Sequence, residues 1–152
     1  MRRHPRAKRL QIILDMAERE EETLLTRWGQ LQRQLTAEQE QRDQLVLYNH
    51  EYQQRLSAPG QGPLSGGSIQ ATLGFMTQIE QALEKQKEKL ALLEKQTATA
   101  HQAYLEQHGK VQALIKLMDK LDSEHDAEQE KQLQKQADEF ANRAASIRMQ
   151  NK

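Results

Sequence analysis

The chain has 152 residues, of which 22 are basic and 22 are acidic, so its formal net charge is zero. Only 36% of the residues are hydrophobic and 4% are aromatic, and the mean hydropathy is −0.94. This composition excludes a conventional globular core and suits a narrow apolar seam between solvated helices. Because the chain has no cysteine, a disulfide framework and a thiolate metal site are excluded as well.

The first expected element is a basic arm over residues 1–9, in which five of nine residues are Lys or Arg. No apolar run follows that would make the arm a signal peptide or allow a helix to cross a bilayer, so we expect a cytoplasmic chain without direct membrane insertion. The arm suits an acidic protein surface, a phosphate backbone or a solubilising role. Nucleic acid is disfavoured because interleaved aromatic residues are absent. The basic residues are Arg2, Arg3, Arg6, Lys8 and Arg9.

Pro5 marks a possible start point of the first helix, and a heptad rhythm then predicts that helix over residues 10–57. From Leu10 to Leu56, ten of fourteen positions at alternating spacings of three and four are apolar, and no proline interrupts them. Trp28, the only tryptophan, is expected to pack in this seam. Four seam positions are polar, and they either fix the pairing of the helices or mark points of flexibility. These positions are Glu21, Glu38, Arg42 and Asn49.

A Gly/Pro turn is expected over residues 58–67, followed by a second helix over 68–150 with Ser68 as its N-cap. We therefore predict an all-α fold, an elongated two-helix antiparallel coiled coil with a longer C-terminal helix, forming a single coiled-coil domain over residues 1–152. Beyond about residue 120 the second helix has no partner in the hairpin. Its exposed stripe either overhangs, frays or is covered by another protein, and includes Leu133, Phe140 and Ile147.

Catalytic and metal sites are not expected. A two-helix hairpin offers no concave site that could position a base and an oxyanion hole, so we do not expect an enzyme or a cofactor. His101 and His108 share a helix face, and Asp122 with His125 forms one weak ligand pair, but the matching pair on a second helix is missing. The glycine-rich turn lacks the lysine of a phosphate-binding loop.

Phe75 lies next to the seam of the second helix rather than within it. That seam consists of Met76, Ile79, Leu83, Gln86, Leu90, Leu93, Thr97, Ala100, Tyr104, Gln107, Val111, Leu114, Met118 and Leu121. Phe75, Ile79, Ala82 and Gln86 are spaced at i, i+4, i+7 and i+11, so they form a stripe along one helix face. An exposed stripe of this kind is typical of a helix-docking surface. The alternative is that Phe75 folds over the turn and covers neighbouring leucines, Leu64 and Leu73.

Over nearly its whole length the chain resembles the FliJ-type stalk proteins of bacterial flagellar type III export. The resemblance rests on the basic start, the pair in Leu45-x-x-Tyr48-x-x-x-Tyr52, the Gly/Pro break near residue 60, the Phe75 stripe and the segment ending in Asp138-Glu139-Phe-Ala141. The gate-binding pattern of the family is Phe-x3-Leu-x2-Ala-x3-His. Here Ile79 replaces the Leu, and Gln86 replaces the His and so removes an ionisable group.

The resemblance implies a non-enzymatic export component that is similar to the central stalk of rotary ATPases. Its basic arm would engage the export ATPase ring and its regulator, its Phe75 stripe would contact the membrane export gate protein, and it would escort export chaperones. Such a protein would be cytoplasmic and peripherally associated with the inner membrane. Two alternatives remain, namely the equivalent stalk of a virulence type III secretion system and a generic coiled-coil scaffold or dimerisation module.

Overall fold

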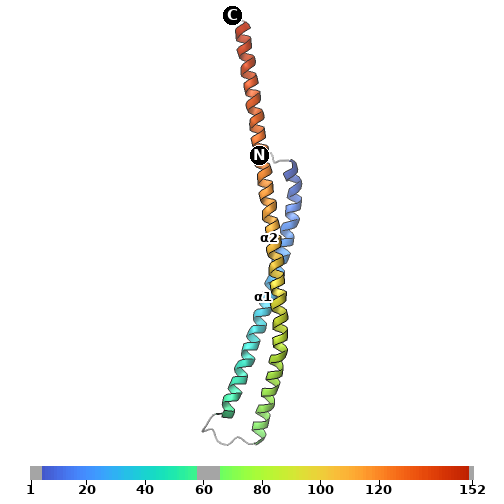
Figure 1. Ribbon diagram of the computed structural model, residues 1–152, viewed down its shortest axis with the longest axis vertical. Coiled ribbons are helices and arrows are strands. Elements are labelled where there is room, and N and C mark those ends of the chain that lie inside the picture. The colour runs from blue at the N-terminus through green and yellow to red at the C-terminus, as the bar shows by residue number, and fades with distance from the viewer. Residues whose placement is uncertain (1–4, 58–65, 151–152) are drawn as a thin grey trace. The chain divides into compact units, whose positions relative to one another are not determined.

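The computed structural model describes residues 5–57 and 66–150, and all of them are helical. Helix α1 spans Pro5–Ser57 and has 53 residues, and helix α2 spans Gly66–Gln150 and has 85 residues. The all-α prediction with a longer second helix is confirmed (Figure 1). Neither described helix contains a stretch that is long and apolar enough to span a membrane.

Both helices begin earlier than their predicted ranges, and α1 begins at the possible start point that the sequence marked at Pro5. Helix α1 begins at Pro5 instead of residue 10, because the fixed φ of proline suits the first helical position and its missing N–H is not needed there. Helix α2 begins at Gly66, so Ser68 lies within the first turn and is not the N-cap. Most of the predicted Gly/Pro turn, residues 58–65, lies outside the described residues.

The chain divides into two compact units. The central unit is Glu22–Leu105, and the terminal unit combines the chain up to Glu21 with the chain from Glu106. Helices α1 and α2 each contribute to both units. The single domain expected from the sequence stays a prediction.

In the central unit the two helices pack in opposite directions. Contacts between them pair Trp28 with His101, Glu38 with Gln86 and Tyr52 with Phe75, so residue numbers rise along α1 as they fall along α2. The predicted antiparallel pairing is thus confirmed. The core of this unit is a cluster of four buried leucines at the predicted seam positions Leu31, Leu35, Leu90 and Leu93, with Ala100 packed against them.

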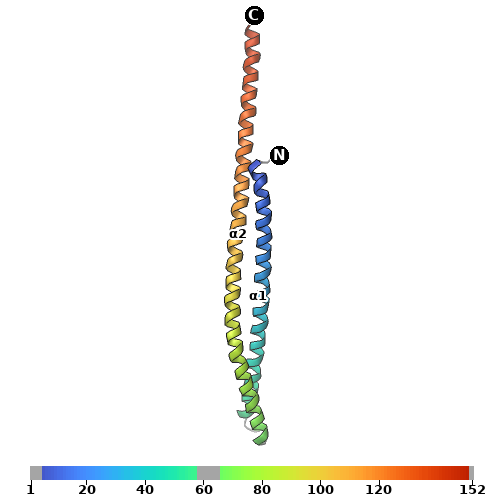
Figure 2. The same ribbon diagram turned by 90° about the vertical axis from the view of Figure 1, so that its right-hand side faces the viewer.

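The terminal unit has a second apolar cluster. Leu14 of α1 is buried with Val111 and Met118 of α2. Other apolar side chains of the predicted seam pack around these three, including Leu10 and Leu114. Figures 1 and 2 both show α2 continuing well beyond the start of α1 in this unit. From residue 131 to 150 every described side chain is exposed except that of Ala144, which is half-buried.

Candidate partner-binding surfaces

Phe75 is the most accessible of the residues predicted for the gate-binding stripe. It is 53% exposed, whereas Ile79 and Ala82 on the same side of α2 are half-buried. The Phe75 ring stacks on the ring of Tyr52 from α1, with centroids 6.2 Å apart and an interplanar angle of 15°. One part of the Phe75 ring therefore contacts α1, and another part faces solvent, where a partner could reach it.

A cation extends this aromatic cluster along α1. The guanidinium carbon of Arg55 lies 5.6 Å from the centre of the Tyr52 ring, within the range of a cation–π contact. Leu73, two residues before Phe75, is 49% exposed. Phe75 therefore does not bury Leu73, as the alternative interpretation required. Leu64, the other leucine of that alternative, lies outside the described residues.

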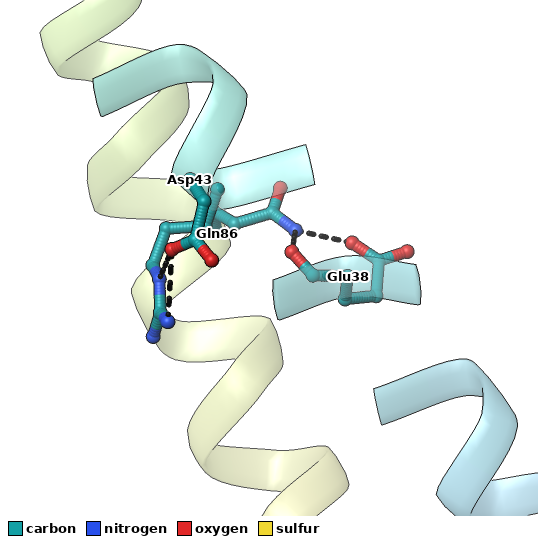
Figure 3. A network of polar contacts seen from close by, with 4 residues as sticks. Glu38, Asp43 and Gln86 are labelled. Carbon is teal, nitrogen blue, oxygen red and sulfur yellow. Dashed lines mark hydrogen bonds and ion pairs between the residues drawn. The ribbon is translucent and has the colours of Figure 1, made fainter. Parts of the chain in front are cut away.

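Gln86 does not belong to an exposed stripe. It is only 8% exposed, and its side-chain amide donates hydrogen bonds to the backbone oxygen of Glu38, at 3.0 Å, and to the Glu38 carboxylate (Figure 3). Figure 3 also shows Asp43, whose carboxylate accepts two hydrogen bonds from the neighbouring Arg42 of α1. The prediction of an exposed stripe is thus corrected for Gln86, whereas its predicted position in the seam is confirmed, because the side chain joins α2 to α1.

Glu38 is the centre of this polar cluster. Lys89 Nζ donates to Glu38 Oε1 at 2.8 Å, so the carboxylate accepts hydrogen bonds from two residues of α2. The hydrogen bond from Lys89 lowers the pKa of Glu38 below its ordinary value of 4.5, and the bond from Gln86 lowers it further, with partial burial acting in the opposite direction. A partly buried polar group that is satisfied across the interface favours one alignment of the two helices over others.

The structure describes three of the five basic residues that were predicted to bind the ATPase. Arg6, Lys8 and Arg9 are exposed and lie in the first turns of α1, whereas Arg2 and Arg3 lie outside the described residues. The first turn of α1 has no acidic residue. Cations at a helix N-terminus are disfavoured by the macrodipole by about 0.3–1 kcal/mol each, so helix stability does not explain this arrangement.

The C-terminal part of α2 presents large apolar side chains to solvent. Leu133, Phe140, Ile147 and Met149 are 64%, 76%, 59% and 80% exposed. The first three return at intervals of seven residues, so they share one face of the helix. In the structure this segment is helical and exposed, and the sequence-based alternative in which another protein covers it stays a prediction.

Trp28 packs against α2, as the sequence predicted. Its ring stacks on His101 with centroids 4.2 Å apart and on Tyr104 at 5.8 Å. His108 Nδ1 lies 2.6 Å from Glu21 Oε1 across the terminal unit. Within residues 5–57 and 66–150, no group of three His, Cys, Asp or Glu side chains is arranged to hold a metal ion.

The sequence did not identify the contacts that these surfaces make across the hairpin. Glu38 and Gln86 are both polar seam positions, and the pairing of two such positions was the one signal that could have predicted their hydrogen bonds. Tyr52 was placed in the seam, but its stacking on Phe75 depends on the pairing of α1 with α2. Periodicity within one helix contains no information on that pairing.

Comparison with known proteins assigns the chain to a family. The family model described as "Flagellar FliJ protein" matches residues 6–150, which is nearly the whole chain and includes both apolar clusters and the Phe75 face. No curated protein matches the chain, and no solved structure matches it either. The chain therefore belongs to the FliJ family of flagellar proteins and is a component related to flagellar protein export.

Proposed function

We propose that this protein acts as the stalk of a flagellar export ATPase and couples the ATPase ring to the membrane export gate. It performs no chemistry of its own, and it works in the cytoplasm at the inner membrane, with the ATPase regulator and the export chaperones as further partners. Family membership supports the setting. The main support for the gate contact is that Phe75 is half-exposed while its ring stacks on Tyr52.

The gate contact consists of Phe75, Ile79 and Ala82 on one side of α2, with Phe75 as the anchor. An aromatic side chain that is already held in one orientation loses little conformational freedom on binding, so more of its burial is available as affinity. Such anchors commonly contribute about 2 kcal/mol or more to an interface. Gln86 contributes indirectly, because its hydrogen bonds to Glu38 hold this part of α2 against α1.

The gate contact is tested with two matched variants, Phe75→Ala and Leu73→Ala. The two side chains are almost equally exposed, at 53% and 49%, and lie two residues apart on the same helix. We expect Phe75→Ala to weaken binding to the isolated cytoplasmic part of the gate protein by about tenfold or more and to reduce motility. Leu73→Ala should leave both near the wild-type level. Equal behaviour of the two variants would remove Phe75 from the gate contact.

The ATPase contact lies at the start of α1 and along the exposed C-terminal part of α2. Basic side chains at the start of α1 complement an acidic ring surface, and the apolar face over 131–150 offers area to bury. We expect the double variant Arg6→Ala, Arg9→Ala to reduce stimulation of the purified ATPase, and the control Lys85→Ala, Lys87→Ala to leave it unchanged. Undiminished stimulation by the first variant at physiological salt would exclude these residues from the mechanism.

A further inference from the structure

The central unit contains a groove between α1 and α2 that none of the surfaces above includes. Its volume is about 430 Å³, with Arg27 and Leu31 on the α1 side. The residues on the α2 side run from Leu92 to Ala103 at helical spacings of three and four. The eleven residue-to-residue steps from Leu92 to Ala103 rise about 17 Å along the helix, so the groove follows about three turns of α2. This length suits another helix lying alongside the pair.

The groove has an apolar floor and, along part of α2, a wall of short side chains. Leu31 lies buried at the floor, at 3% exposure, and Leu92 stands 56% exposed at the edge. The α2 side carries the long side chains of Lys95 and Gln96 and, further along the helix, the short side chains of Thr99, Ala100 and Ala103. Short side chains allow a third helix to approach closely, and a side chain of that helix would remove Leu92 from water.

The charged residues that line the groove have the same sign. They are Arg27 and Lys95, one from each helix, and no Asp or Glu is among the lining residues. Both side chains are exposed, so their aliphatic stems can pack beside an incoming helix while their charges remain at the edge. A partner with carboxylates along both flanks of its apolar stripe would complement this pair of cations.

We propose that this groove binds an amphipathic helix of a partner protein, with acidic residues beside its apolar stripe, to form a three-helix bundle. A second copy of the chain does not fit the charges. The exposed apolar helix that a second copy would offer, residues 131–150, carries four basic residues and two acidic ones. The groove shares no residue with the gate or ATPase contacts proposed above, so either proposal stands if the other fails.

The test uses the full-length protein and two labelled synthetic peptides. Each is a 21-residue helix with one Leu/Ala stripe, flanked by Glu in one peptide and by Lys in the other, and binding is followed by fluorescence anisotropy at physiological salt. We expect the Glu-flanked peptide to bind and Leu92→Glu to weaken its binding by about tenfold or more. The matched control Leu105→Glu changes a leucine of similar exposure, 46%, outside the groove lining, and should bind like the wild type.

Charge reversal of the groove gives the second arm of the test. In the double variant Arg27→Glu, Lys95→Glu, preference should switch from the Glu-flanked to the Lys-flanked peptide. Both substituted positions are exposed, so the hairpin should fold with unchanged helicity. Failure of the Glu-flanked peptide to bind, equal binding by Leu92→Glu and Leu105→Glu, or an unchanged preference in the double variant would each overturn the proposal. Concentration-dependent dimerisation abolished by Leu92→Glu would assign the groove to a second copy instead.

Discussion

Two leucines on α2, two residues apart, allow the packing of the central unit to be tested directly. Leu90 is 4% exposed within the leucine cluster, whereas Leu92 is 56% exposed. Truncation to Ala removes three carbon groups, which is about 2.4 kcal/mol of transfer free energy when the side chain is buried, and a residual cavity adds to this. We expect Leu90→Ala to lower the free energy of unfolding by about 3 kcal/mol.

For Leu92 the same reasoning predicts about 1 kcal/mol or less, because more than half of its surface is already in water. The higher helix propensity of Ala offsets part of that loss. Urea unfolding followed by far-UV circular dichroism measures both variants, with an unchanged denaturant slope as the control for a comparable unfolded state. If Leu92→Ala lowers the free energy of unfolding as much as Leu90→Ala does, the assignment of Leu90 to the buried face and of Leu92 to the exposed face of α2 would be refuted.

Three further predictions concern single features of the hairpin. Because the pKa of Glu38 is lowered in the folded state, its contribution to stability is present above pH 4.5 and is lost as the pH falls through the lower folded value; Glu38→Gln should flatten this acid limb of the pH–stability curve. The buried Asn49 Oδ1 has no hydrogen-bond partner among the described residues, so Asn49→Leu should raise the free energy of unfolding by about 1 kcal/mol in urea titrations, and a loss would mean that the amide is satisfied. Amides of residues 131–150 should exchange fastest in the free protein, and protection equal to that of the leucine cluster would show that this segment folds back.

The fold could be predicted from the sequence because a heptad rhythm reports directly on which face of a helix is buried. Leu31, Leu35, Leu90 and Leu93 were all seam positions, and all are buried. The starts of the helices were less well predicted, since Pro5 and Gly66 begin helices through local backbone conformation rather than through periodicity.

The candidate surfaces were predicted less completely than the fold. Phe75 was correctly placed beside the seam, and its exposure agrees with that position. Gln86 occupies both the stripe and the seam in a helical projection, and spacing alone does not decide which role its side chain takes. The position of Glu38 on the other helix decides it, because the Gln86 amide reaches both the backbone and the carboxylate of that residue.

The stacking of Trp28 between the helices has a practical consequence for studying the protein at work. Trp28 is the only tryptophan in the chain, and its ring is half-buried against His101 and Tyr104 of α2. Local separation of α1 from α2 at this point would transfer the indole to water and shift its emission to longer wavelengths. The unlabelled protein therefore carries an intrinsic optical reporter of whether the central unit stays closed or opens when a partner binds.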